Sequence, residues 1–237
     1  MSPVLQRNLK GDKIFKIKFL GTSSIEGLPR EDCDCRQCQS KDKKDRRLRS
    51  SLLIKSRILI DAGPDILKQL KTQPIRNLDS VITTHEHEDH IGGLKYLLKI
   101  NRNLRLIRMK PGQHFKLLGV DFFAFKVLHS KLTTTIGLII DNQVAYLPDS
   151  SSLELALKYL KDVKIAILDG SVFERSFGGH LAMKETIVLT KPFKNLEKIY
   201  FTHNGHTRKT HREMIKIVQT LGDKRFTLAY DGLELKI

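Results

Sequence analysis

Four side chains of the kinds that bind metal ions are packed into one short segment. They are His85, His87, Asp89 and His90, at positions i, i+2, i+4 and i+5, directly after the apolar run Ser80–Thr83. A tight turn after a buried strand can direct His85 and His87 at one ion, and Asp89 and His90 at a second. Imidazole nitrogen and carboxylate oxygen suit zinc, manganese or iron. The alternative interpretation of this segment is a solvated polar loop that binds no metal. Two ions a few Å apart can activate a water and clamp the oxygens of a displacement, so the segment predicts a dinuclear hydrolytic centre.

The three cysteines form a second candidate metal site. Cys33, Cys35 and Cys38 are tightly clustered and odd in number, which makes a poor disulfide framework and indicates a reducing compartment. A structural zinc site is normally tetrahedral and closed, and this segment offers only three thiolates. We therefore expect one structural zinc that takes its fourth ligand from elsewhere, with reduced, unbound cysteines as the alternative.

The elements that must position these residues are short β-branched runs with amphipathic helical patterns between some of them. Strands are expected at 14–20, 51–60 (a hairpin), 80–83, 104–109, 120–128, 134–140, 144–147, 163–168 and 198–201, followed by a last hairpin over 226–236 that turns at Asp231-Gly232. Helices are expected at 65–70, 94–100, 153–160, 181–189 and 212–221. This order predicts an α/β fold of one domain over residues 1–237, in which two sheets pack together and are flanked by helices.

The histidine-rich segment resembles the signature of the metallo-β-lactamase superfamily, which lies at the end of a central strand. The resemblance implies an αββα sandwich, and Asp61 is similar to the family's aspartate that supports the metal loop. His129, Asp149 and His203 follow further strands in the family's order; taken singly, they could be ordinary polar residues or a helix cap. The resemblance implies one ion held by His85, His87, His129 and Asp149, and a second held by Asp89, His90, His203 and Asp149.

A narrower resemblance comes from the order Gly-Thr, Gly-x-Pro, Cys-x-Cys-x-x-Cys at the start of the chain. It is similar to the PhnP-like branch, which contains the phosphoribosyl 1,2-cyclic phosphate phosphodiesterase and, more distantly, a protein of pyrroloquinoline quinone biosynthesis. This implies His206 as the fourth ligand of the structural zinc and His180 as a general acid, so that His180 and Asp89 are the candidate catalytic residues. The alternative for His180 is a helix N-terminal residue without a role. His114 and His211 have no expected role, and His211 is expected at the surface.

The charge of the chain is strongly positive. Its 42 Lys and Arg exceed its 26 Asp and Glu, giving a formal net charge of +16. Such a surface attracts anions, so phosphorylated metabolites or nucleic acid are candidate partners, although basic chains also occur in generally basic proteomes. Nine basic residues lie in 36–57, and 91–120 contains seven Lys or Arg and no acid; each run can also be a solvated face.

These observations favour a dinuclear-metal phosphodiesterase, with zinc or manganese as the catalytic ions, that hydrolyses a small cyclic phosphodiester such as a phosphoribosyl cyclic phosphate. An RNA-processing nuclease of the same superfamily is the alternative, because it better explains the charge, although no inserted arm is evident. A non-hydrolytic accessory protein should lack ligands, and the full set is present. No stretch approaches the ~20 apolar residues of a membrane span and no signal-peptide core is evident, so a cytoplasmic protein without membrane association is expected; a homodimer is left open.

Overall fold

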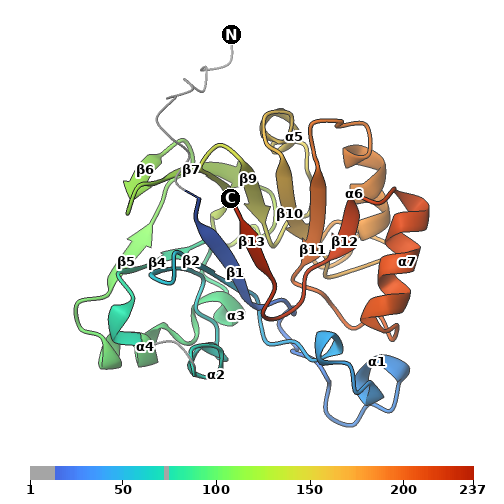
Figure 1. Ribbon diagram of the computed structural model, residues 1–237, viewed down its shortest axis with the longest axis horizontal. Coiled ribbons are helices and arrows are strands. Elements are labelled where there is room, and N and C mark those ends of the chain that lie inside the picture. Colours follow the sequence, from blue (N-terminus) through green and yellow to red (C-terminus); the bar gives the residue numbers. More distant parts are fainter. Residues whose placement is uncertain (1–13, 72–74) are drawn as a thin grey trace.

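Two mixed β-sheets form the centre of the protein (Figure 1). The computed structural model describes residues 14–71 and 75–237. The first sheet has the strand order β13-β1-β2-β3-β4-β5 and the second the order β12-β11-β10-β9-β8-β7-β6. The strands are β1 (Lys16–Gly21), β2 (Ser51–Ile54), β3 (Ile58–Ile60), β4 (Ser80–Thr83), β5 (Arg105–Arg108), β6 (His114–Leu117), β7 (Val120–Val127), β8 (Thr135–Ile140), β9 (Val144–Leu147), β10 (Ile165–Asp169), β11 (Lys198–Thr202), β12 (Phe226–Leu228) and β13 (Glu234–Lys236).

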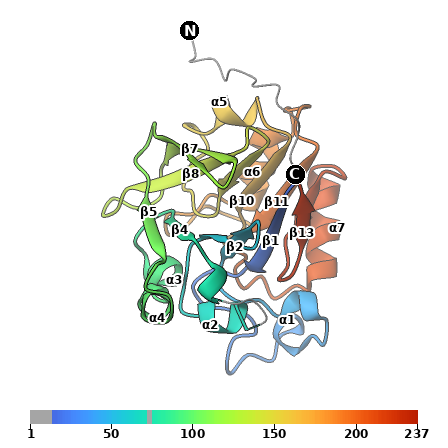
Figure 2. The same cartoon turned by 60° about the vertical axis from the view of Figure 1, so that its left-hand side comes forward.

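Helices cover the outer faces of both sheets. The α-helices are α1 (Arg36–Gln39), α2 (Ile66–Gln69), α3 (Glu88–Ile91), α4 (Leu94–Ile100), α5 (Leu157–Leu160), α6 (Met183–Thr190) and α7 (His211–Leu221), and the 3-10 helices are η1 (Lys43–Asp45) and η2 (Ile75–Asn77). Figures 1 and 2 show α6 and α7 beside β10, β11 and β12, and α2 and α4 on the side of the first sheet. The αββα sandwich expected from the sequence is confirmed.

Three apolar clusters hold these four layers together. The middle cluster lies between the sheets and includes Phe19, Ile82 and Tyr146. A second joins the outer face of the second sheet to the helices that cover it, through residues such as Phe201 and Met214. The third joins the first sheet to α2 and α4. Strands β2, β3, β4, β8 and β9 are buried along their whole length, on both faces, which explains why these strands read as continuous apolar runs rather than alternating ones.

The direction of the central strands brings the candidate site together. Strands β3, β4 and β5 run parallel to one another, as do β9, β10, β11 and β12. The loops that follow β3, β4, β9, β10 and β11 carry Asp61, the segment 84–90, Asp149, His180 and His203 respectively. The carboxyl ends of parallel strands are where open α/β sheets bind ligands.

The C-terminal hairpin expected over 226–236 is wrong. Strand β12 pairs in parallel with β11 in the second sheet, whereas β13 pairs antiparallel with β1 in the first. Between them Asp231 accepts hydrogen bonds from Thr22 Oγ1 and from the backbone N–H of Leu48, at 2.8 and 2.7 Å, so the Asp-Gly pair is a crossing between the sheets that side-chain bonds hold in place. Packing decides this, because Phe226 packs under the helices and Leu235 packs between the sheets.

Two further differences are local. Strand β6 was not expected from the sequence; it forms a hairpin with β7 through Leu118 and Gly119, both at positive φ. The helix expected over 153–160 is shorter, because only Leu157–Leu160 is α-helical. In the part of the chain that the structure describes, no helix has both the length and the apolar character needed to cross a bilayer.

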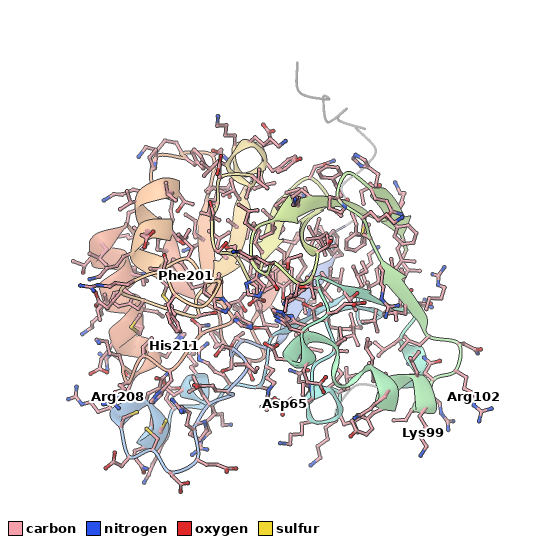
Figure 3. The ribbon with its side chains drawn as sticks, turned by 180° about the vertical axis from the view of Figure 1, so that it is seen from behind. Asp65, Lys99, Arg102, Phe201, Arg208 and His211 are labelled. Atoms are coloured by element: carbon pink, nitrogen blue, oxygen red, sulfur yellow. The ribbon has the colours of Figure 1, made fainter. Side chains whose placement is uncertain are left out.

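The expectation that His211 lies at the surface is also wrong. His211 is buried at the start of α7, inside the body of the molecule (Figure 3). Arg47, from the basic run 41–49, is buried beside it and donates to His211 Nδ1 at 2.8 Å, to Thr22 Oγ1 at 2.9 Å and to the carbonyl of Ala229. Burial and the Arg47 charge lower the pKa of His211 to about 3, so its Nδ1 accepts the bond. This arginine is therefore an internal cross-link, and the basic run is not a uniform anion-binding surface.

Candidate metal centre

The first group of candidate ligands is formed by His85, His87 and His129, whose ligand nitrogens all lie within 4.8 Å of one another. His85 Nε2 is 3.0 Å from His87 Nδ1, and His129 Nε2 is 3.2 Å from the same atom. Burial, with the neighbouring His90, lowers the pKa of His85 to about 2, and burial, with His129, lowers the pKa of His87. The lowered pKa values of His85 and His87 favour their neutral form, which is the form that binds a metal ion.

The second group is formed by Asp89, His90 and His203, again within 4.8 Å. His203 Nε2 lies 3.1 Å from Asp89 Oδ2 and 3.4 Å from His90 Nε2. Burial opposes ionisation of Asp89, but the contacts of its carboxylate with His203 and His90 outweigh burial and lower the pKa of this carboxyl far below its ordinary value. The lowered pKa favours the anionic carboxylate, which makes Asp89 a candidate oxygen ligand.

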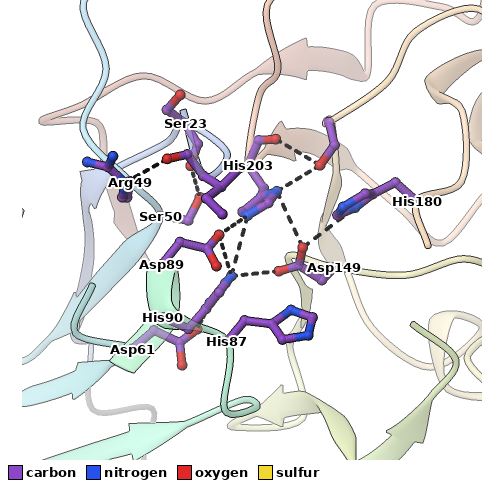
Figure 4. A network of polar contacts seen from close by, with 12 residues as sticks. Ser23, Arg49, Ser50, Asp61, His87, Asp89, His90, Asp149, His180 and His203 are labelled. Carbon is purple, nitrogen blue, oxygen red and sulfur yellow. Dashed lines mark hydrogen bonds and ion pairs between the residues drawn. The ribbon is translucent and has the colours of Figure 1, made fainter. Parts of the chain in front are cut away.

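Asp149 lies near members of both groups, and Figure 4 shows its contacts with His90, His203 and His180. Its Oδ2 is 2.9 Å from His90 Nε2 and its Oδ1 is 3.4 Å from His203 Nδ1, and with His85 and His90 it forms a further candidate metal group. A carboxylate placed in this way can bridge two ions.

The imidazoles are oriented by their other nitrogen atoms. His90 Nδ1 donates to Asp61 Oδ2 at 2.8 Å, and Asp61 also accepts from the backbone N–H and the hydroxyl of Thr84 at 2.8 Å each. Because the Thr84 hydroxyl donates to Asp61, it accepts from His85 Nδ1 at 3.0 Å. His129 Nδ1 donates to the carbonyl of Gly179 at 2.9 Å. In each case the bond made by Nδ1 fixes the ring and leaves Nε2 as the atom that would bind an ion, as in metal sites whose ligands are fixed from behind.

The electrostatics of the centre fit cations. Asp149 Oδ2 is buried and, although His90 Nε2 lies 2.9 Å away, it accepts no hydrogen bond of good geometry within the described residues. A buried carboxylate oxygen that lacks a well-formed bond is costly. His90 is fully enclosed, yet Asp149 and Asp61 outweigh this burial and raise its pKa well above the ordinary value. Both observations show that positive charge is stabilised at this place. Divalent ions bound by these residues would supply that charge and meet the open valence of Asp149.

His180 lies at the open side of the centre with its ring about one-fifth exposed. Its Nδ1 donates to Asp169 Oδ2 at 2.7 Å and lies 3.6 Å from Asp149 Oδ1, and its ring packs beside those of His129 and His203. Burial opposes protonation, but the bond to Asp169 outweighs it and raises the pKa of His180. An imidazole that is protonated near neutral pH, with Nε2 free, can donate a proton to a leaving oxygen.

Asp169 and Ser171 were not singled out from the sequence. Asp169 ends β10 and is buried, and it accepts from Ser150 N at 3.0 Å, from Ser171 N at 2.8 Å and from Ser171 Oγ at 2.6 Å. The Ser171 hydroxyl oxygen lies 2.7 Å from His203 Nδ1 and accepts a hydrogen bond from it. This bond leaves His203 Nε2 as the ring nitrogen that would bind an ion. Asp169 thus holds His180 directly and orients His203 through Ser171. One sequence signal could have identified Asp169. It is an acidic residue at the end of a strand, and the two neighbouring strands of the sheet are followed by Asp149 and His203.

The cysteine cluster meets His206 as a separate group of four. His206 Nε2 lies 3.5, 3.1 and 3.5 Å from the sulfurs of Cys33, Cys35 and Cys38, and all four ligand atoms lie within 4.8 Å. Burial raises the pKa of Cys38 to about 11; for Cys35, burial is outweighed by hydrogen bonds from the Cys38 backbone and His206, which lower its pKa to about 6. Three sulfurs and one imidazole fit a closed tetrahedral zinc site.

The family of the chain follows from comparison with known proteins. The model of the metallo-beta-lactamase superfamily matches residues 45–176, which is more than half of the chain. The chain belongs to the metallo-beta-lactamase superfamily. It is similar to a diphosphatase from the PhnP family of known crystal structure, with 26% identity over 94% of this chain and 97% of that one and a TM-score of 0.82. The resemblance to the superfamily and to its PhnP-like branch is therefore confirmed, and both comparisons support a metal-dependent hydrolase.

Other comparisons concern the fold or a longer protein. Zinc-bound PqqB from Methylobacterium extorquens is 19% identical, covers 94% of this chain and 100% of its own, and has a TM-score of 0.79. The short form of human tRNase Z is 14% identical, covers 93% of this chain and 98% of its own, and has a TM-score of 0.63. A curated octanoyltransferase from Porphyromonas gingivalis (strain ATCC BAA-308 / W83) is 28% identical over 91% of this chain and 50% of that protein. The chain therefore spans about half the length of this curated relative.

Proposed function

We propose that the protein is a phosphodiesterase that hydrolyses a small, preferably cyclic, phosphodiester, such as a phosphoribosyl cyclic phosphate, with two divalent ions. The observation that carries the proposal is the position of His180: a raised-pKa imidazole is held by Asp169 beside a carboxylate, Asp149, that two ligand groups share. The similarity to a PhnP-family diphosphatase supports cleavage at phosphorus. The similarity to the curated octanoyltransferase does not support acyl transfer by this chain, because half of that protein has no counterpart here.

The ligand residues have separate tasks in this proposal. One ion would be held by His85, His87, His129 and Asp149, and the other by Asp89, His90, His203 and Asp149. When bound, two such ions, zinc or manganese, activate water and stabilise charge on phosphoryl oxygens. The chain itself fixes the imidazoles through Asp61, Thr84 and Ser171, so that no ligand has to reorient when a substrate enters.

The proton for the leaving oxygen comes from His180. Its Nδ1 is committed to Asp169 at 2.7 Å, so Nε2 is the atom that donates. Asp169 stabilises the protonated ring before the reaction and fixes its direction. Asp149 Oδ1 lies 3.6 Å from His180 Nδ1, so the acid is next to a residue that would hold the ions.

The structural zinc proposed for Cys33, Cys35, Cys38 and His206 would act on the fold rather than on the chemistry. His206 comes three residues after His203 in the same loop. A metal at this place would tie the cysteine segment to the loop that carries a catalytic ligand.

A nuclease acting on structured RNA is the second candidate, and the exposed basic residues of the run 41–49 favour it. These are Lys41, Lys43, Lys44 and Arg46. Lys99 and Arg102, from the acid-free stretch, also project outward (Figure 3). The structures of tRNase Z that the chain resembles are under 15% identical and bear on the fold alone.

Salt dependence separates the two functions. The metal-loaded protein should hydrolyse a nucleoside 2′,3′-cyclic phosphate and bis(p-nitrophenyl) phosphate, with a KM that changes little between about 50 and 200 mM salt, because few phosphates are engaged. Charge reversal at Lys43 and Arg46, both exposed, should leave these rates unchanged. Cleavage of structured RNA that falls steeply with salt and is lost in the charge-reversed variant would instead establish the nuclease.

A further inference from the structure

An exposed phenylalanine lies next to the proton donor. Phe177 is 80% exposed and belongs to none of the three apolar clusters of the described chain. Single exposed apolar residues are common and need no explanation by themselves. This one differs because its backbone is tied to His180, only three residues away.

Phe177 and His180 form the closing pair of a two-residue turn. The N–H of Phe177 donates to the carbonyl of His180 at 3.0 Å, and the N–H of His180 donates to the carbonyl of Phe177 at 3.0 Å. The two residues between them, Gly178 and Gly179, have φ of +59° and +88°, as a type I′ turn requires. Directly opposite residues of an antiparallel pair carry their side chains on the same face, about 4.5–5.5 Å apart at Cβ. The Phe177 ring therefore lies on the face of the turn that His180 directs toward Asp149 and Asp169.

The turn is fixed on both sides. A Cβ on Gly179 would lie 2.8 Å from the carbonyl oxygen of His129, and His129 Nδ1 donates to the Gly179 carbonyl at 2.9 Å. Before Phe177, the Ser176 hydroxyl donates to Glu185 at 2.7 Å and accepts from Ala182 N at 2.9 Å. The backbone that carries Phe177 is thus fixed next to His129 and His180 rather than part of a free loop.

From this geometry we infer that Phe177 is a stacking platform for the base of a nucleotide substrate, a proposal that rests on the phosphodiesterase function above. His180 faces the leaving oxygen, so the ring beside it meets the part of the substrate attached to that oxygen. The net charge of +16 favours an anionic substrate, and an anionic group joined to a planar ring is the chemistry of a nucleotide. Aromatic side chains bind bases by stacking without reading their sequence. Among small phosphodiesters, the inference therefore favours those that carry a base over sugar phosphates that do not.

Binding of two matched phosphates tests the assignment without turnover. Adenosine 5′-monophosphate and ribose 5-phosphate share the phosphate and the sugar and differ by the base. Isothermal titration calorimetry on the zinc-loaded protein should give a Kd roughly tenfold lower for the nucleotide. Phe177→Ala and Phe177→Leu should remove this difference, and Phe177→Tyr should retain it, because a ring rather than apolar bulk is required. Val188→Ala, an exposed position on α6, is the control and should change neither Kd.

Kinetics on two cyclic phosphates separate the inference from the function beneath it. Adenosine 2′,3′-cyclic phosphate carries a base and glycerol 1,2-cyclic phosphate does not. Because stacking stabilises the ground state and the transition state alike, Phe177→Ala should raise KM for the first by roughly tenfold and leave KM for the second unchanged. Absence of any hydrolysis by the wild type would overturn the phosphodiesterase proposal, while the calorimetry still decides on the base. Equal Kd values for the two phosphates in the wild type, or equal losses for both in Phe177→Ala, would overturn the stacking assignment.

Discussion

Asp169→Asn tests whether the buried carboxylate under His180 controls the proton donor. Asp169 accepts four hydrogen bonds, of which the one from His180 Nδ1 at 2.7 Å is the only one whose donor changes charge during the proposed reaction. An amide is almost the same size but cannot stabilise an imidazolium. A hydrogen bond to a charged group contributes about 1.5–3 kcal/mol, which corresponds to a loss of about 10- to 150-fold in kcat. The upper end of that range reaches the 10²–10⁴ that a general acid typically provides, as expected for a residue that supports the acid rather than replaces it.

The loss should depend on the leaving group. A cyclic nucleoside phosphate needs a proton on its leaving alkoxide, whereas the nitrophenolate of bis(p-nitrophenyl) phosphate leaves without one. We expect Asp169→Asn to lower kcat for the first by about 10² and to change the second less than threefold. His180→Ala should show the same selectivity with a larger loss, and the double variant should be no slower than His180→Ala alone.

The pH profile supplies an independent readout. Asp169 raises the pKa of His180, and an acid is active only while protonated, so activity is lost as pH rises through that pKa. Asp169→Asn lowers the pKa, and the descending limb of kcat should therefore move to lower pH. Ser171→Ala, which breaks the link to His203 but keeps the bond to His180, should leave the limb in place, and metal content by mass spectrometry should match the wild type. Equal losses on both esters, or additive losses in the double variant, would refute the reasoning.

Three further outcomes follow from the structure. Cys35→Ser should release one zinc ion and lower the melting temperature while the catalytic ions stay bound; elemental analysis that shows unchanged metal would remove the thiolate site. His211 has a pKa lowered to about 3, so folding loses stability as pH falls from about 6.5 toward 3, by about 1.4 kcal/mol per pH unit at most. His211→Gln should show a flatter dependence in urea unfolding, and an identical slope would contradict this. Tyr146 is fully buried and its hydroxyl has no hydrogen-bond partner within the described residues, so Tyr146→Phe should be neutral or stabilising by up to about 1 kcal/mol; a clear loss of stability would show an unseen partner.

Much of the architecture could be predicted because apolar runs and ligand spacing are local signals. The strands that precede His85, Asp149 and His203 could be recognised from their apolar runs, and the structure brings these three side chains together. What failed depended on pairing between distant segments. The residues of 226–236 do not indicate that its two strands belong to different sheets. Likewise, the charge of Arg47 does not indicate that its side chain is buried, because its burial depends on distant residues that pack around it. The role of Asp169 could not be predicted, because it depends on hydrogen bonds with His180 and Ser150, which are 11 and 19 residues away in the sequence.

The crossing of the C-terminal segment between the sheets has a consequence for synthesis on the ribosome. Strand β1 pairs with β2 on one edge, but its other edge stays open until Glu234–Lys236 arrive. At about 5–20 residues per second, the interval between these segments takes on the order of tens of seconds. An open edge strand is a template for wrong pairing, and the exposed charges of Lys16 and Lys18 on β1 oppose it. Strand β13 therefore completes the sheet by covering the open edge of β1. A nascent chain whose synthesis stalls before β13 should aggregate rather than fold.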